Sequence, residues 1–279
     1  MKIGHFQVEC LPGDHEANTA KVISCLQLAD AEGVEIVSFP EGMLTGWHDS
    51  EAQNRRHSLA ADGPEIAALL DESSRFSTTF IVGFGEVRGS RLFQSALVAE
   101  GGALLGVYSK AIPWFSWHTP GRDFPVFERK EVKFGVILCN DGCFVEPSHI
   151  LALKGARIIF APHYTYLPKE ILLPHFLSVR AQHTARAIEN NVWFLRGSNV
   201  VLGERDPCMP SVDGVGYGDS YLMDPYGELL VRSQRNVECF VHYDVDVSAV
   251  AARQWPCTTA AQELGSIIQG ILKDEPLER

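Results

Sequence analysis

Short apolar runs rich in β-branched residues alternate along the chain with longer segments of helical character. The runs at 34–40 (VEIVSFP) and 156–162 (ARIIFAP) are too short for helices and have the composition of buried strands. Residues 15–32 carry apolar side chains at near-helical spacing, and 169–190 are predicted to form a longer helix whose start Pro174 perturbs. This order of elements predicts the α/β class, with sheets covered by helices.

Cap and turn residues mark where several of these elements begin and end. Asp14 is placed to cap the first helix, Gly33 to end it, and Pro64 opens a second helix at the position that proline favours. Further strands are expected at 78–87, 92–100, 103–110, 133–139, 192–198, 218–224 and 228–232, and a helix at 146–155.

The sequence shows no linker, low-complexity segment or short-period repeat, so a single domain over residues 1–279 is expected. The tail from about residue 256 carries apolar side chains at helical spacing, and these are Leu264, Ile267, Ile268, Ile271 and Leu272. A terminal apolar helix needs a surface to cover. The pattern leaves open whether that surface belongs to the same domain or to another subunit.

The charge balance restricts the partners. A formal net charge of −11 and a pI of about 5.4 disfavour nucleic acid and anionic membrane surfaces, because both attract basic proteins. No apolar stretch reaches the roughly 18 residues that a membrane helix needs, and the first residues lack the apolar core of a signal peptide. The seven cysteines are odd in number and scattered, which is typical of reduced thiols, so a cytoplasmic location is expected.

Cys139 ends an apolar strand and is followed at once by polar and glycine residues, in the run KFGVILCNDGCFVEP. Backbone N–H groups at the start of the next helix are expected to lower the pKa of a thiol in this position. Because the thiolate is the reactive form, a catalytic nucleophile is expected here. A buried core cysteine would fit the same local sequence, so the position alone does not decide between the two.

Glu41 and Lys110 also stand at the ends of predicted strands. Burial at such a position would raise the pKa of Glu41 into the range of a general acid or base, although a solvated glutamate is the commoner occupant. Lys110 precedes AIPWFSW, where it either extends to solvent along aromatic side chains or holds a developing negative charge. Taken singly, neither residue indicates a function.

Taken together and in this order, the three residues and their local sequences resemble the nitrilase superfamily of carbon–nitrogen hydrolases. FPEGMLTGW resembles the glutamate motif, FQSALVAEGGALLGVYSK with a following TPG resembles the central segment, and GVILCNDGCFVEP resembles the nucleophile motif. ALKGARIIFAP, ARAIENNVWF and GDSYLMDPYGELL resemble later landmarks, so the likeness spans about residues 1–250. It implies a four-layer αββα sandwich that dimerises to αββα-αββα and often assembles further, as a homodimer or higher homo-oligomer.

The resemblance also implies a role for each residue of the triad. Cys139 would attack the amide or nitrile carbon, and Glu41 would take the thiol proton and later activate water. Lys110 and the backbone N–H of Asn140 would stabilise the tetrahedral oxyanion, and loss of one such donor typically slows a reaction by about 10²–10³.

Other motifs are assigned no direct chemical role. Asp141 and Glu146 match acidic positions of the nucleophile motif and are expected to be structural. Cys139, Cys143 and His149 lack the second pair of ligands that a zinc site needs, and a metal would occupy the nucleophile. GFGEVRG has the wrong spacing for a dinucleotide fingerprint and precedes a strand rather than a helix. We therefore expect no metal and no cofactor.

The chain departs from the family pattern at two places. Many members carry a second glutamate between the lysine and the following Pro-Gly, but this stretch reads AIPWFSWHT and contains no carboxylate. We hypothesise that His118 replaces that acid or that no residue does; counting back from Pro120 instead puts Trp114 at its place, and His118 would then lie on the rim of the site. Ser109 stands where an arginine often precedes the lysine.

Aromatic residues are expected on two sides of the site. The loop APHYTYLP carries His163, Tyr164 and Tyr166, which are predicted to contact substrate, with simple packing as the alternative. Trp114 stands in the segment expected to form the opposite wall, together with Phe115 and Trp117. Walls of this kind favour a substrate with apolar or flat parts.

The predicted activity is hydrolysis of a small linear amide or N-carbamoyl compound, with release of ammonia. The CND sequence resembles the carbamoyl-amino-acid branch and KAIPW the aliphatic amidase branch, so the branch stays open. On the long helix, Arg180 is a candidate to grip a substrate carboxylate, whereas Arg186 is expected to pair with an acid. The alternatives are a true nitrilase and a catalytically silent member that acts as a binding or scaffold subunit.

Overall fold

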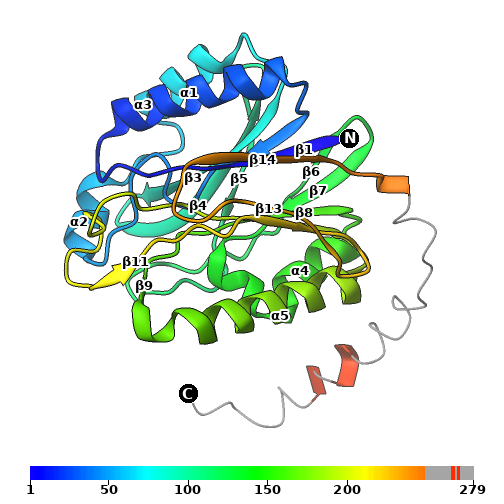
Figure 1. Cartoon of the computed structure of the whole chain (residues 1–279). Helices are drawn as coiled ribbons and strands as arrows, with labels where there is room; N and C mark the ends of the chain where they lie inside the picture. The colour runs from blue at the N-terminus through cyan, green and yellow to red at the C-terminus, as the bar shows by residue number, and fades with distance from the viewer. Residues whose placement is uncertain (249–264, 268, 271–279) are drawn as a thin grey trace.

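Two six-stranded sheets pack face to face, and helices cover both outer faces (Figure 1). The computed structural model describes residues 1–248, 265–267 and 269–270. The first sheet has the order β14-β1-β2-β3-β4-β5, with bounds Cys239–Asp244, Lys2–Gln7, Ile36–Ser38, Thr79–Arg88, Arg91–Glu100 and Ala103–Ser109. The second has the order β13-β12-β10-β8-β7-β6, with bounds Leu229–Arg232, Tyr221–Met223, Trp193–Gly197, Ile158–Pro162, Val132–Val136 and Val126–Arg129.

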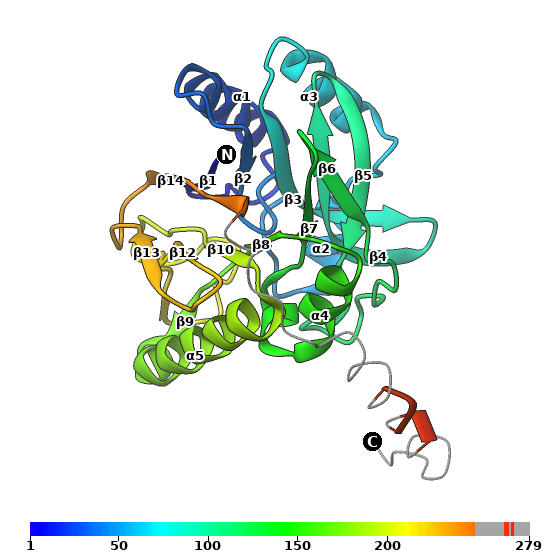
Figure 2. The ribbon, with the colours of Figure 1, turned by 90° about the vertical axis from the view of Figure 1, so that its right-hand side faces the viewer.

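The helices form the two outer layers. Figure 2 shows α1 and α3 over the first sheet and α4 and α5 over the second. Their bounds are His15–Ala31 for α1, Glu51–His57 for α2, Pro64–Ser73 for α3, Val145–Leu153 for α4 and Leu172–Asn190 for α5. Two 3₁₀ turns, η1 (Cys139–Cys143) and η2 (Lys169–Ile171), and a short β9–β11 pair (Leu167–Pro168 and Gly214–Val215) complete the described elements.

Three apolar cores hold these four layers together. Between the sheets, side chains such as Ile81 of the first and Phe160 of the second are almost completely buried. Leu26 of α1 lies in the core beneath the first sheet's helices, and Leu151 of α4 lies in the core of the other outer layer. Because each sheet is buried on both faces, its central strands read as continuous apolar runs. The predicted αββα sandwich is confirmed.

The parallel strands at the centre of each sheet position the site. β1, β2 and β3 run parallel in the first sheet, and β7, β8 and β10 run parallel in the second. The carboxyl ends of parallel strands meet at one edge of a sheet, and this is where ligands bind in open α/β folds. Glu41 follows β2, Cys139 follows β7, and both face the space between the two edges.

Most local predictions agree with the structure. The Asp14 carboxylate accepts a hydrogen bond from the Ala17 N–H (3.1 Å), Gly33 has a φ of +67° after α1, and Pro64 opens α3. The α-helix expected from residue 169 begins instead at Leu172, after η2, and Pro174 lies in its first turn.

The sequence patterns missed α2, β6 and β14. β14 pairs antiparallel with β1 along its whole length, which long-range contacts rather than local sequence determine. The structure describes only Ile267 of the apolar stripe predicted in the C-terminal tail. The rest of that stripe lies outside the described residues. None of the described helices is both long and apolar enough to cross a membrane.

Candidate active site

A buried ion pair joins the first two predicted catalytic residues. Lys110, which directly follows β5, donates from Nζ to Glu41 Oε1 at 2.8 Å, and both side chains are about 1% exposed. Glu41 Oε2 also accepts from the Tyr164 N–H (3.3 Å), so the carboxylate is held from two sides. Gly83 on β3 makes room for this turn, because a Cβ there would lie 2.7 Å from the Glu41 Cα.

Lys110 is charged in this environment. Burial alone would lower its pKa, but Glu41, Cys139 and Asp141 together raise the pKa above its ordinary value. A permanent cation therefore stands beside the thiol, as oxyanion stabilisation requires.

Cys139 is the first residue of η1, at the turn that follows β7. Its φ is +42°, a left-handed conformation that costs energy for a residue with a Cβ and that occurs most often at functional sites. The thiol lines the same cavity as Lys110, and its Sγ lies 3.9 Å from the Tyr164 carbonyl oxygen. The turn therefore presents the sulfur at the edge where the two sheets meet.

Asp141 fixes this turn from inside. Its carboxylate accepts hydrogen bonds from the Tyr108 hydroxyl (2.7 Å), the Leu138 N–H (3.0 Å) and the Ile112 N–H (2.8 Å). These bonds tie the nucleophile turn to β5 and to the loop after the lysine, which supports the structural role expected for Asp141. Burial raises the pKa of this carboxyl group. Glu146 is exposed in the first turn of α4.

Asn140 follows Cys139 and lines the cavity. Its side-chain amide donates to the Ile112 carbonyl (3.1 Å), which anchors the residue. Its backbone N–H belongs to the first turn of η1, where amide groups have no partner within the helix. The position is therefore compatible with the oxyanion contact expected for it.

The thiol pKa differs from the sequence-based expectation. Burial raises the pKa of Cys139 to about 12; the charges of Lys110 and Arg196 lower it, while Glu41 and Cys143 raise it. Burial thus outweighs the lowering of the thiol pKa that was expected from strand-end N–H groups. The free protein therefore holds a protonated thiol, which needs a base to become a nucleophile.

The cavity above the thiol has a volume of about 390 Å³. Of the substrate-binding candidates, the ones that line it are Trp114, His163, Tyr164 and Tyr166. Arg180 does not line the cavity; its guanidinium donates to Asp219 Oδ1 at 2.7 Å and stacks on Phe176. Arg186 was expected to pair with an acid, and it forms an ion pair with Glu189 on the same helix.

One wall of the cavity was missed by the sequence patterns. It consists of residues from α5 and the residue before it, namely Ile171, His175, Ser178, Val179 and Gln182, with Met209 and Val212 from a loop. Polar side chains at 175, 178 and 182 recur at helical spacing, and this was the signal that could have indicated a helix face turned toward the site.

His118 is buried beside the lysine rather than exposed on the rim. It is 4% exposed, does not line the cavity, and neither ring nitrogen has a hydrogen-bond partner among the described residues. Burial and then the charge of Lys110 lower its pKa to about 4, so the imidazole is neutral at ordinary pH. The Gln94 backbone carbonyl accepts a hydrogen bond from the Lys110 backbone N–H. The Gln94 side-chain amide is buried and, like the His118 ring, has no hydrogen-bond partner among the described residues.

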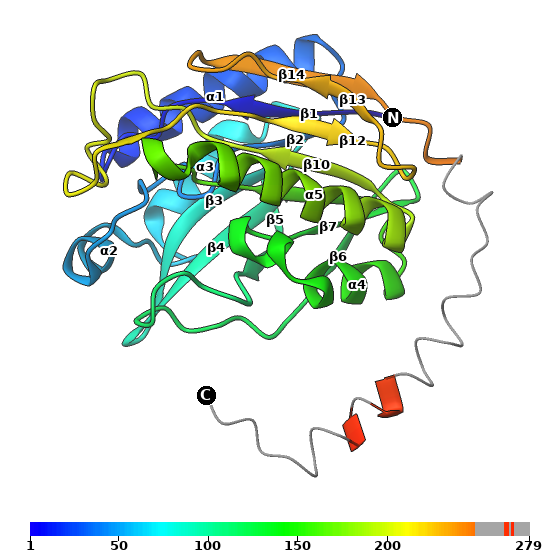
Figure 3. The same cartoon turned by 60° about the horizontal axis from the view of Figure 1, so that its bottom comes forward.

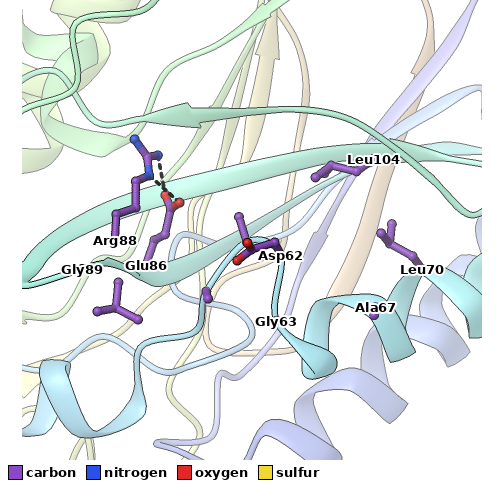
Figure 4. Close-up of a pocket in the computed structure, with 11 residues that line it drawn as sticks. Asp62, Gly63, Ala67, Leu70, Glu86, Arg88, Gly89 and Leu104 are labelled. Carbon is purple, nitrogen blue, oxygen red and sulfur yellow. Dashed lines mark hydrogen bonds and ion pairs between the residues drawn. The ribbon is translucent and has the colours of Figure 1, made fainter.

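A larger hollow of about 670 Å³ lies elsewhere, between α3 and the ends of β3 and β5 (Figure 4). Its buried carboxylate, Glu86, already accepts hydrogen bonds from Arg88 and Ser95. The described residues lining this hollow include no cysteine, serine or histidine, so we place the chemistry at Cys139. Nowhere in the described part of the chain do three His, Cys, Asp or Glu side chains gather as a metal site.

The chain belongs to the carbon–nitrogen hydrolase family, whose model matches residues 2–254. It is 25% identical over 260 residues to an (R)-stereoselective amidase of Pseudomonas sp., covering 91% of this chain and 89% of the relative. It is 25% identical over 262 residues to the N-carbamoylputrescine amidase of Arabidopsis thaliana, covering 87% and 86%.

A solved structure shows the same fold. It is a mutant amidase from Nesterenkonia sp. AN1 that carries the acetamide moiety of fluoroacetamide covalently at its active site cysteine. The TM-score is 0.75 at 17% identity, with 94% of this chain and 96% of that chain covered. The predicted membership of the nitrilase superfamily is confirmed.

The ionisation of Cys139 can be measured from thiolate absorbance at 240 nm, with Cys139→Ala subtracted. We expect no Cys139 thiolate in the wild type between pH 6 and 10, because its pKa is about 12. Glu41→Gln should lower the midpoint by about one to three pH units, since it removes a negative neighbour and leaves Lys110 unpaired. Lys110→Met should give no thiolate in this range. A wild-type thiolate near neutral pH would contradict the dominance of burial.

Proposed function

We propose that this chain is a thiol-dependent amidohydrolase that releases ammonia from a small linear amide or N-carbamoyl compound. The observation that carries the proposal is the buried Glu41–Lys110 pair beside Cys139 at a mainly apolar cavity. The two curated relatives, an amidase and a carbamoyl amidase, support an amide or carbamoyl substrate.

In the first half-reaction Glu41 takes the thiol proton as Cys139 Sγ bonds to the carbonyl carbon. The carbonyl π electrons move to oxygen, and Lys110 with the Asn140 N–H stabilises that oxyanion. The oxyanion then collapses, the C–N bond breaks, and Glu41 returns its proton to the leaving nitrogen. Ammonia departs and a thioester with Cys139 remains.

In the second half-reaction Glu41 takes a proton from water as the water oxygen bonds to the thioester carbon. The second oxyanion uses the same donors. Its collapse breaks the C–S bond, and the proton on Glu41 returns to Cys139. The product is the carboxylic or carbamic acid. Glu41 is suited to these transfers because its ion pair and the Tyr164 N–H hold it in one orientation.

Ammonia release from a panel of amides, N-carbamoyl compounds and nitriles tests this proposal. We expect Cys139→Ala to abolish release, Glu41→Gln to lower kcat by about 10²–10⁴ and Lys110→Met by about 10²–10³. Cys143→Ala, which removes the other thiol that lines the cavity, is the matched control and should keep most of the activity. Activity on nitriles alone would favour a nitrilase. No release by folded protein from any compound would favour the silent alternative.

We further propose that neutral His118 supports Lys110 in place of the second glutamate found in many relatives. The support comes from its burial, its two unpaired ring nitrogens and the influence of Lys110 on its pKa. A neutral imidazole is able to accept a hydrogen bond from an ammonium group without adding charge.

His118→Gln, which keeps a neutral acceptor, should retain kcat within about tenfold, whereas His118→Ala should lose more. The unfolded histidine binds protons below pH 6.5 and the folded one only near pH 4, so the wild type loses stability as pH falls between these values. Between pH 7 and pH 4, the free energy of unfolding of His118→Gln should fall by roughly 3 kcal/mol less than that of the wild type. Thermal unfolding at pH 7 and pH 4 measures the difference. Unchanged turnover and pH profile in His118→Ala would exclude a role.

We also propose that the chain forms a homodimer through the outer faces of α4 and α5, which lie side by side (Figure 3). Leu173 and Leu177 are one helical turn apart on α5 and are 65% and 59% exposed, and Leu153 of α4 is 53% exposed. Large apolar side chains exposed on neighbouring helices are costly in water, and a second copy that presents the same helices covers them in a two-fold arrangement.

Light scattering after size-exclusion chromatography tests the dimer. Leu173→Asp with Leu177→Asp should shift the protein from about twice its chain mass to a single chain, because buried charges oppose association. Leu105→Asp, at an exposed leucine of β5 on another face, is the control and should leave the mass unchanged. A wild-type monomer at micromolar concentration would contradict the proposal.

A further inference from the structure

The catalytic cavity has almost no charge to offer a substrate. Of the described residues that line it, only Lys110 is charged, and Glu41 neutralises it at 2.8 Å. The two histidines in the lining are neutral: burial and then the charge of Arg196 lower the pKa of His175 to about 4, and burial lowers that of His163 well below its ordinary value. A charged group on the acyl chain would therefore lose water without gaining a direct partner.

The arginines near the cavity are committed elsewhere. Arg180 is paired with Asp219, and Arg196 is fully buried behind the wall, where it donates to the Asp219 carbonyl and to the Thr165 hydroxyl (3.0 Å). Arg196 has no carboxylate within ion-pair distance among the described residues, so its positive charge is only partly compensated. This positive charge repels a cationic substrate group, so the cavity disfavours a cation more strongly than an anion.

The remaining lining is mainly apolar, with polar groups that carry no charge. Trp47 stacks on Tyr164 with ring centroids 5.7 Å apart, and Val179 and Met209 also line the cavity. Gln182 lines the cavity too, and its Oε1 is buried with no hydrogen-bond partner among the described residues. An unpaired acceptor favours N–H donors and opposes a carboxylate.

We propose that the cavity selects amides whose acyl group is uncharged and apolar, and rejects both carboxylate-bearing and amine-bearing amides of the same length. This inference rests on the proposed amidohydrolase function and makes it more specific. N-carbamoyl α-amino acids, which carry a carboxylate, are then poor substrates, while neutral aliphatic or aromatic primary amides are good ones.

Three six-carbon amides provide a matched test: hexanamide, adipamate with a terminal carboxylate, and 6-aminohexanamide with a terminal ammonium group. We expect kcat/KM for hexanamide to exceed that for adipamate by about 100-fold, with 6-aminohexanamide lower still, since unpaired buried charge is strongly disfavoured. Either charged amide reacting as well as hexanamide would overturn this inference and leave the amidohydrolase function standing. No ammonia from any of the three would overturn both.

Charge placed on the wall should weaken the preference for the uncharged amide. Ser178 lines the cavity, is exposed enough to tolerate change, and precedes Gln182 by about one turn, or roughly 6 Å along α5. Ser178→Arg should raise the adipamate-to-hexanamide ratio of kcat/KM by about tenfold, and Ser178→Glu should do the same for 6-aminohexanamide. Glu72→Arg on the exposed face of α3 is the control and should leave both ratios unchanged. Unchanged ratios in both Ser178 variants would contradict selection by charge.

Discussion

The buried ion pair between Glu41 and Lys110 is the interaction on which the site depends. A buried pair is weak evidence for stability, because the cost of removing two charges from water is only repaid by good geometry. Here the geometry is supplied by two loops that follow different strands and by the Tyr164 N–H. The fold thus maintains two charges at an apolar location where packing alone would favour hydrophobic side chains. The proposed chemistry at the neighbouring thiol would account for that cost.

The packing of two sheets explains how such distant residues meet. Glu41 and Lys110 belong to the first sheet and Cys139 to the second, and the inter-sheet core fixes the separation of their edges. Asp141 transmits that restraint to Cys139, because its carboxylate accepts hydrogen bonds from the Tyr108 hydroxyl of β5 and from the Leu138 N–H of the turn. The left-handed conformation of Cys139 persists because the surrounding hydrogen bonds over-determine it.

The layered fold and the grouping of Glu41, Lys110 and Cys139 could be predicted from sequence because both depend on local patterns. The β-branched runs of β2 and β8 and the strand-end positions of Glu41 and Cys139 are visible without tertiary information. Properties that arise from distant contacts were not visible. Arg180 is engaged by Asp219, 39 residues later, and the pKa of Cys139 depends on a burial that only the assembled sheets create. The α5 wall was missed because its polar spacing does not reveal what the helix covers.

Arg196 shows how a residue outside the cavity restricts the choice of base. Three histidines near the site would be candidates to accept the thiol proton if their pKa values were ordinary. They are His163, His175 and His183. Burial lowers each pKa, and the charge of Arg196 lowers each further. An imidazole that binds a proton so weakly is a poor general base at neutral pH. The same positive charge also lowers the pKa of Cys139, so Arg196 makes the thiol easier to ionise and these imidazoles harder to protonate.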